Sequence, residues 1–329
     1  MYLFIRGFGR FILRPEAAIA QYNGRLKTKD LNRTRCNEVP MPEFKNILYE
    51  IDGPVLTITW NRPDALNAIS QNLEREFHHA LDIAAENEAI RSIIVTGSGR
   101  AFSAGYDISG DRSKRPRLPT STHLKRQWGS SMLSTGGPTH IMHLMEHPKP
   151  IIAAVNGWCI GGGFWYSLAC DITIASDQAT FGQPEIRMTS NTTVLFALLC
   201  GWKNAHRYAL TGDHFDAQEA LRIGAINEVV PHDQLLEKAR ALALRLAKVP
   251  SESIRLNKAI TTYGLDAMGL RSALNMNGAL STIVEAANDG PDVEHLDRAQ
   301  AEGSFGAFLK ARDEPFLPEP FGPRSKPRD

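Results

Sequence analysis

The sequence predicts an α/β fold, in which strands and helices alternate along the chain. Two observations carry this prediction: apolar, β-branched runs of strand length recur, and stretches with helical spacing of apolar residues follow them. Glycine-rich turns separate several of these segments. The chain has 329 residues, of which 43% are hydrophobic and 22% charged, so it is long enough for a large core and has the composition of a soluble globular protein.

The predicted elements begin near residue 45. Residues 55–60 (VLTITW) alternate like a strand, and the following NRP breaks that strand. Residues 70–88 show the apolar spacing of an amphipathic helix, with Ser70 as its N-cap. Further strands are expected at 92–97, 151–155, 171–175 and 226–230.

The rest of the chain reads as helical from Asp233 onward, notably at 237–249, 251–264 and 267–288. The last residues, 316–329, are Pro-rich and charged, and we expect them to be a disordered tail. We therefore divide the chain into an extension (1–44), a core (45–250), a helical region (251–315) and this tail.

The N-terminal extension is basic, with eight Arg or Lys residues against three acidic ones in residues 1–40. It can be a disordered extension, an over-long start upstream of Met41, or a transit peptide. We expect a cytoplasmic protein, or a mitochondrial matrix protein if residues 1–40 are a transit peptide. The four cysteines lack metal-ligand spacing, which favours free thiols in a reducing compartment: Cys36, Cys159, Cys170 and Cys200.

Charge and hydropathy exclude several classes of partner. The net charge is +1, so no global charge points to nucleic acid. The longest apolar runs, such as 193–199, are far shorter than the roughly 20 residues of a membrane span. The sequence has neither a GxxxxGK[ST] phosphate loop nor a GxSxG nucleophile motif.

Two glycine-rich segments, 99–109 (GRAFSAGYDIS) and 156–171 (NGWCIGGGFWYSLACD), each follow a predicted strand. Bare backbone N–H groups bind anions, and two that converge on one oxygen, with a helix N-terminus behind one of them, form an oxyanion hole. Glycine permits close approach of a ligand to the backbone. Taken alone, the GGG triplet is more often a simple turn or a tight helix contact than a ligand site.

Three segments together resemble motifs of the crotonase superfamily, also called the enoyl-CoA hydratase/isomerase family: FSAGYDIS (102–109), NGWCIGGG (156–163) and FGQPEI (181–186). The resemblance extends, in order, over about residues 45–265. It implies a crotonase-type ββα spiral with a C-terminal helical trimerisation region. We expect a homotrimer or a dimer of trimers, with an apolar stripe between subunits formed by Leu270, Leu274 and Leu280.

The resemblance also implies an acyl-CoA thioester substrate and no cofactor, since coenzyme A is part of the substrate. The N–H groups of Tyr106 and Gly162 would form the oxyanion hole for a thioester enolate. Asp107 is expected to hold the turn. The remaining substrate-binding residues implied are Ala104, Gly105 and Gly161 around the hole, with Arg62, Ala65 and Leu66 toward coenzyme A.

The sequence departs from the family at the acid/base residues. Hydratases of the family hold a water between two glutamates; Glu185 occupies one of these positions, but Trp165 occupies the other. An indole accepts no proton, so ordinary hydration is doubtful and a single-glutamate isomerase or atypical CoA lyase is favoured. An acyl-CoA-binding pseudoenzyme is the alternative, and a dinucleotide site is a weaker one. Trp165 is also expected to raise the pKa of Glu185.

Several other residues have two interpretations. The irregular segment 109–140 would form a wall of the acyl pocket, and its basic residues could meet phosphates or simply be solvated: Arg112, Lys114, Arg115 and Arg117. Trp128 and Met132 fit either the pocket or the core. We expect Asn191 or Thr192 to cap a helix.

Histidines recur at helical spacing in HIMHLMEH: His140, His143 and His147. No carboxylate or cysteine stands at ligand spacing along the chain, so no metal site is expected there. The pair His78–His79 is expected to be structural.

Overall fold

The structure is a computed structural model that describes residues 43–109, 138–189, 192–287, 291–320 and 324. The predicted extension, 1–44, lies outside these residues except at its last two positions, and Phe44 packs against the core. In the described part of the chain, no helix is long and apolar enough to cross a membrane.

Strands form two sheets, which confirms the predicted α/β class. The larger sheet has the order β1-β2-β3-β5-β7-β10; it is parallel except for the antiparallel β1–β2 pair. Its strands are β1 (Ile47–Asp52), β2 (Val55–Trp60), β3 (Ser92–Gly97), β5 (Ile151–Val155), β7 (Ile172–Ser176) and β10 (Glu228–Val230). The smaller sheet has the order β4 (Ala101–Ser103), β6 (Trp158–Ile160), β8 (Thr180–Gly182) and β9 (Phe215–Asp216).

The two sheets are built by a repeated ββα unit. The consecutive pairs β3–β4, β5–β6 and β7–β8 each give one strand to the large sheet and the next to the small one. Parallel pairing sets the register, with Ile93 opposite Ile151 in the large sheet and Ala101 opposite Trp158 in the small one. The chain therefore advances as a spiral, as its family resemblance implies.

Helices follow these strands. Helix α1 (Gln71–Glu86) begins at its predicted N-cap, since the Ser70 hydroxyl accepts a hydrogen bond from Leu73 N–H. The other helices of the core are α3 (Pro138–Glu146), α4 (Gly162–Ala169), α5 (Val194–Cys200), α6 (Trp202–Ala209), α7 (Ala217–Arg222) and α8 (Leu235–Leu246). Short 3-10 helices are η2 (Pro63–Ala65), η4 (Pro184–Arg187) and η5 (His232–Gln234).

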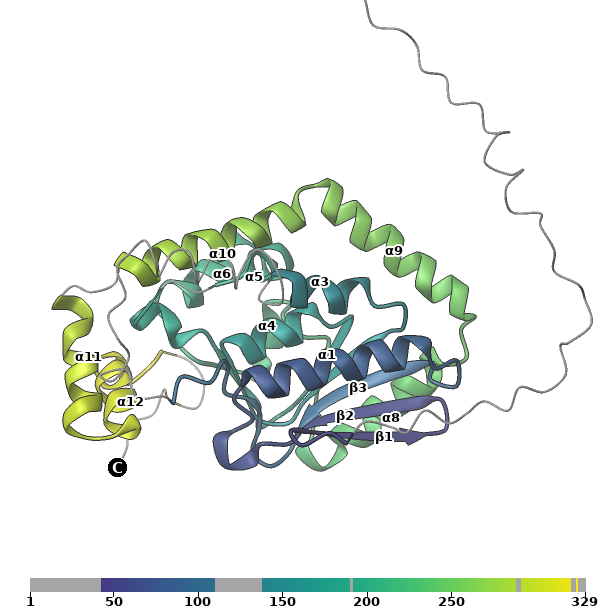
Figure 1. The fold of residues 1–329 in the computed structure, drawn as a ribbon, viewed down its shortest axis with the longest axis horizontal. Helices are drawn as coiled ribbons and strands as arrows, with labels where there is room; N and C mark the ends of the chain where they lie inside the picture. The colour runs from purple at the N-terminus through teal and green to yellow at the C-terminus, as the bar shows by residue number, and fades with distance from the viewer. Residues whose placement is uncertain (1–42, 110–137, 190–191, 288–290, 321–323, 325–329) are drawn as a thin grey trace, which may run out of the picture. The chain divides into compact units, whose positions relative to one another are not determined.

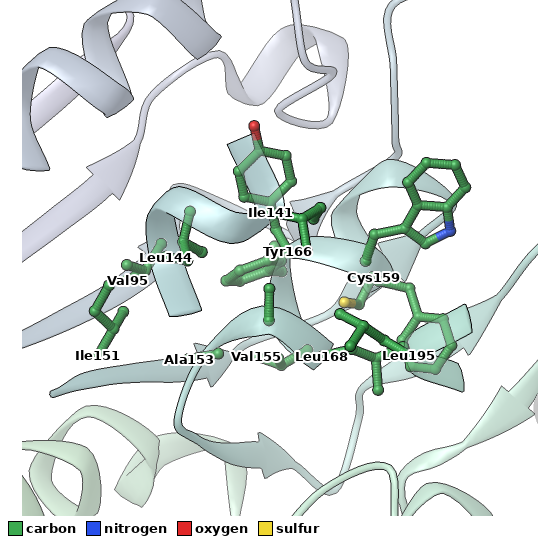
Figure 2. Packing of buried hydrophobic residues seen from close by; sticks show 14 of the residues in the cluster. Val95, Ile141, Leu144, Ile151, Ala153, Val155, Cys159, Tyr166, Leu168 and Leu195 are labelled. Carbon is green, nitrogen blue, oxygen red and sulfur yellow. The ribbon is translucent and has the colours of Figure 1, made fainter. Parts of the chain in front are cut away.

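The central strands β3 and β5 are buried at every residue, as expected for parallel strands covered on both faces. In β5, Ile152 and Ala154 belong to the cluster that includes α8, whereas Ile151, Ala153 and Val155 belong to the cluster of α1, α3 and α4. Figure 2 shows these last three side chains along β5, with Leu144 of α3 and Tyr166 of α4 in the same cluster. Alternate side chains of β5 thus point to opposite faces of the large sheet, and one of these faces packs against α1, α3 and α4.

The C-terminal helices are α9 (Ser251–Ala267), α10 (Leu270–Ala287), α11 (Pro291–Glu302) and α12 (Phe305–Asp313), followed by η6 (Glu314–Phe316) (Figure 1). The prediction of a disordered tail at 316–329 is wrong for residues 316–320 and 324. Glu319 is fully buried, because its carboxylate bonds with His214 and Arg187. The other residues of this segment lie outside the described part.

Two of the three leucines predicted to lie between subunits do not lie on the surface. Leu270 and Leu274 are 5% and 3% exposed and pack in the chain's own core, whereas Leu280 is 52% exposed. The exposed apolar residues of α9 and α10 are Leu256, Ile260, Tyr263, Met276, Leu280 and Ile283. We name these six residues the α9–α10 apolar face.

Candidate active site

Parallel pairing of β4 with β6 brings the two glycine-rich turns together at the C-terminal ends of these strands. A Cβ added to Gly105 would lie 2.9 Å from Ile160 O and 3.3 Å from Gly162 N. Gly105 also has φ +89°, a left-handed backbone that favours glycine. The chain therefore places Tyr106 N–H and Gly162 N–H in neighbouring turns, and their role as an oxyanion hole stays a prediction.

Both amides are available for a ligand. Within the described residues, no protein acceptor is found for Tyr106 N–H or Gly162 N–H, although Gly105 O and Asp107 N on either side of Tyr106 bond with Ile69. Gly162 is the first residue of α4, where backbone donors have no partner inside the helix. The helix dipole adds positive potential at the same point. This arrangement has the features of an oxyanion hole.

Glu185 lies directly against the second turn. A Cβ added to Gly161 would lie 1.8 Å from Glu185 Oε1, so only glycine fits there, and its φ is +56°. Oε2 of Glu185 is buried and has no hydrogen-bond partner. Burial raises the pKa of Glu185 to about 7. A carboxyl with this pKa can both take and return a proton near neutral pH.

Trp165 stands one helical turn after Gly161 and donates its backbone N–H to Gly161 O. Its side chain is 5% exposed, its indole N–H has no partner, and its ring meets that of Tyr106 edge-on at 6.4 Å between centroids. Near Glu185, Gln183 Nε2 and Thr189 Oγ1 are also buried without a partner. Buried polar atoms are normally paired, so each of these atoms has an unused hydrogen-bonding position.

The loop that carries Arg62, Ala65 and Leu66 is bonded to the Gly105 turn. Leu66 O accepts from Ala104 N–H at 2.9 Å, and Ala65 ends the 3-10 helix η2. The guanidinium of Arg62 donates to Ala68 O and to Asp107 Oδ2, the latter at 3.0 Å.

Asp107 also accepts bonds from Ser109 N–H and Oγ–H, so it holds the turn as predicted. Arg62 is thus engaged in the protein, and its predicted contact with a coenzyme A phosphate stays a prediction.

A cluster behind the hole was not predicted as a unit. It contains Glu74 and His78 of α1, His140 and His143 of α3, and Tyr166 of α4; we name it the imidazole cluster. Glu74 Oε1 accepts hydrogen bonds from the hydroxyls of Tyr106 (3.1 Å) and Tyr166 (2.8 Å). The only signal in the sequence is helical spacing within each segment, because nothing local shows that α1 and α3 lie side by side.

Burial decides the charge in this cluster. It lowers the pKa of His78 to about 2, with further lowering by His140 and His143, so His78 is neutral. Burial also lowers the pKa of His143 and raises the pKa of Tyr106 and Tyr166 well above the usual value. Tyr106 therefore stays protonated, and its hydroxyl is a donor to Glu74 rather than an acid for catalysis.

An ion cluster fixes the turn that carries Glu185. The side chain of Arg187, 1% exposed, pairs with Asp213 (3.1 Å), Asp313 (3.2 Å) and Glu319 (3.1 Å). Next to it, Met188 packs with Leu296 and Phe308 of the C-terminal helices. The C-terminal region is thus attached to Glu185 through the neighbouring residues Arg187 and Met188.

The family profile for enoyl-CoA hydratase/isomerase matches residues 50–289. The chain belongs to this family, the crotonase superfamily. It is 35% identical over 222 residues to a probable mitochondrial enoyl-CoA hydratase of Dictyostelium discoideum, covering 66% of this chain and 75% of the relative. It is 32% identical to a short-chain-enoyl-CoA hydratase of Clostridium acetobutylicum, covering 68% of this chain and 83% of that protein.

A solved enoyl-CoA hydratase/isomerase from Xanthobacter autotrophicus Py2 has the same fold, with a TM-score of 0.74 and 29% identity. The match covers 83% of this chain and 99% of that one. The crotonase fold predicted from the sequence motifs is therefore confirmed, and this family member acts in acyl-CoA chemistry.

Other sequence expectations for this family member have mixed outcomes. The helix cap is Thr193, whose side chain accepts from Leu195 N–H, whereas Thr192 bonds to Gln183; Asn191 lies outside the described residues. Also outside are the proposed pocket wall at 110–137, with its basic residues, Trp128 and Met132. Free thiols are found at the described cysteines Cys159, Cys170 and Cys200.

Proposed function

We propose that this enzyme moves one proton within an acyl-CoA thioester, using Tyr106 N–H and Gly162 N–H for the enolate and Glu185 as the single acid/base. The observation that carries the proposal is the Glu185 carboxyl. Its Oε1 packs against Gly161, next to the two amides, while its buried Oε2 has no protein partner. A group in this state is available to the substrate.

The chemistry then needs no second carboxylate. Glu185 removes a proton from one carbon of the acyl chain, and negative charge develops on the thioester oxygen, where the two amides donate hydrogen bonds. The protonated Glu185 returns the same proton to another carbon, which shifts the double bond. A pKa of about 7 suits both halves of this exchange.

Hydration is the second candidate, because the relatives from Dictyostelium and Clostridium are named as hydratases. Trp165 weighs against it. The indole nitrogen can donate one hydrogen bond to a water but accepts no proton, so only Glu185 could activate that water. We therefore rank isomerisation above hydration, with an atypical lyase reaction or binding without turnover as further outcomes of the test.

The test is a panel of 2-enoyl- and 3-enoyl-CoA thioesters, read by the absorbance of the conjugated thioester and by mass. Isomerisation of 3-enoyl-CoA with crotonyl-CoA hydration slower by on the order of 10²-fold or more supports the proposal. A hydration rate equal to the isomerisation rate contradicts it. Binding without turnover of any member indicates the pseudoenzyme instead.

We further propose that the α9–α10 apolar face packs against other copies of the chain in a homotrimer or a dimer of trimers. The support is an exposed apolar face over two neighbouring helices, including Ile260 at 69% and Met276 at 58% exposed. Sedimentation velocity at micromolar concentration tests this, and a stable monomer contradicts it. The location, cytoplasmic or mitochondrial, is tested by imaging the protein with and without residues 1–40.

A further inference from the structure

We propose that Glu319 is a positioning residue for Glu185, acting from the C-terminal segment through Arg187 and His214. The proposal rests on the proposed function, in which the Glu185 carboxyl is the acid/base. Glu319 is fully buried, and its carboxylate bonds to both Arg187 and His214. Arg187 belongs to the turn that carries Glu185, and His214 lies against the strand that precedes this turn.

The first connection runs through the turn itself. Arg187 is the last residue of η4, the short 3-10 helix that contains Glu185, and its guanidinium donates to Glu319 Oε1 at 3.1 Å. Arg187 Nε donates to Thr211 O at 3.0 Å, and the guanidinium carbon lies 4.1 Å from the centre of the Phe316 ring. The guanidinium is therefore held from several sides, and two of these contacts, Phe316 and Glu319, come from the C-terminal segment.

The second connection runs through the wall on which the Glu185 carboxyl packs. Glu319 Oε2 accepts a hydrogen bond from His214 N–H at 2.8 Å, and His214 Nδ1 lies 3.0 Å from both carboxylate oxygens. A Cβ added to Gly182, the last residue of β8, would lie 3.1 Å from the His214 ring. Gly182 O accepts from Gly161 N–H at 2.9 Å, and Glu185 Oε1 packs on Gly161.

Both connections end at the same carboxylate. Glu319 supports the turn that carries Glu185 and also, through His214, the glycine on which the Glu185 carboxyl packs. A change at Glu319 should therefore move the Glu185 carboxyl relative to the two amides of the hole. Misplacement of a reacting group by about 1 Å can cost roughly 10²-fold in rate. We expect the loss in kcat rather than in KM, because Glu319 contacts neither of the amides.

Removal of the Glu319 charge does not leave a buried cation unpaired. Arg187 keeps its ion pairs with Asp213 at 3.1 Å and with Asp313 at 3.2 Å. In Glu319→Gln, the new amide oxygen can still accept from His214 N–H. This variant therefore weakens the contact with Arg187 while it keeps the size of the side chain and enough partners for the chain to fold.

The experiment compares Glu319→Gln with wild type in the full chain. Hydrogen–deuterium exchange, read by mass spectrometry on peptides spanning 183–189, reports on the turn because Met188 N–H and Thr189 N–H both bond to Glu185 O. We expect exchange in these peptides to become at least ~5-fold faster. We also expect kcat to fall roughly 10-fold or more, with KM within about 3-fold of wild type.

The matched control is Glu314→Gln in the same C-terminal segment. The side chain of Glu314 is 62% exposed and pairs with Lys310 at 3.6 Å, so both readouts should stay at their wild-type values. Circular dichroism establishes that each variant is folded. If Glu319→Gln does not fold, Phe316→Leu serves as the second variant, because it removes the ring beside Arg187 and keeps every charge. It should show the same changes at roughly 2- to 3-fold.

Wild-type exchange at 183–189 in a folded Glu319→Gln chain would overturn the proposal. Faster exchange with an unchanged kcat would overturn it too, and so would an equal loss of kcat in Glu314→Gln. Wild-type turnover in Glu185→Gln, or no turnover in the wild-type chain, contradicts the proposed function and removes the positioning role with it. That failure is seen in chains whose C-terminal contacts are intact, so the two failures can be told apart.

Discussion

Two carboxylates flank the start of α4, and they are in opposite states. Glu74 accepts hydrogen bonds from Tyr106 and Tyr166 and lies 2.8 Å from His140. Glu185 packs on Gly161, and its buried Oε2 has no partner at all. Burial raises the pKa of Glu185 to about 7. A hydrogen bond to its own backbone and the charge of Arg312 lower this pKa, but by less than burial raises it. Partners make a carboxylate a fixed part of the structure, and their absence leaves it free for chemistry.

The largest expected effect is on kcat, when the charge of Glu185 or of Glu74 is removed by substitution with glutamine. Glu185→Gln keeps the shape but cannot carry a proton, so kcat on the active enoyl-CoA should fall on the order of 10²- to 10⁴-fold. Glu74→Gln should lose less than about tenfold, because the Glu74 carboxylate is already bonded to the hydroxyls of Tyr106 and Tyr166. Steady-state kinetics on both folded variants measures this. Equal losses would mean that Glu74 takes part in the chemistry.

The contact between Glu185 and Gly161 can be broken without touching the carboxylate. Gly161→Ala would place a Cβ 1.8 Å from Glu185 Oε1, so the carboxyl must move and turnover should fall by roughly 10²-fold. Gly53→Ala is the matched control: φ is +58° there, close to +56° at Gly161, but nothing lies within 4 Å. It should lower stability and leave kcat unchanged. An unchanged kcat in Gly161→Ala would contradict the expected displacement of Glu185, and an equal loss of kcat in both variants would attribute the loss to backbone strain.

The raised pKa also predicts a stability difference with a definite sign. Glu185 ionises near pH 7 in the folded chain and near 4.5 when unfolded, so folding favours its protonated form. Stability is complete below about pH 4.5 and falls as pH rises through 7, by up to about 3 kcal/mol. Urea unfolding of Glu185→Gln should therefore show higher stability than wild type at pH 8 and no difference at pH 4.5. A pH-independent difference would contradict the assigned pKa.

The smallest expected effect comes from removing one hydrogen bond of Glu74, the carboxylate that has partners. Tyr106→Phe removes one hydrogen bond to Glu74 but leaves the backbone N–H of the hole in place. We expect a loss of about 1 kcal/mol in unfolding free energy and a kcat within a few fold of wild type. Thermal melting and steady-state kinetics measure both quantities. A large loss of kcat with normal folding would give the phenol itself a catalytic role.

The sequence predicts the surroundings of a residue only where its contacts are local, and the two carboxylates differ in this respect. The strand ends, the two turns and Glu185 lie in short motifs, and the spiral was identified from their order, so this half of the candidate site could be proposed from the sequence. Glu74 was missed because its partners Tyr106, Tyr166 and His140 lie 32 or more residues away on other elements. The buried Glu319 was missed for the same reason: Pro-rich local composition resembles disorder, while its partner Arg187 is 132 residues away.

The attachment of Arg187 has a consequence for the order of events during protein synthesis. This guanidinium needs carboxylates that the ribosome adds 26, 126 and 132 residues later. Until Glu319 has left the exit tunnel, the turn that carries Glu185 holds a buried cation without its full set of counter-charges, a state that is costly in a low-dielectric interior. We therefore expect nascent chains to acquire the fold of the sheets first and the native conformation of the Glu185 turn last.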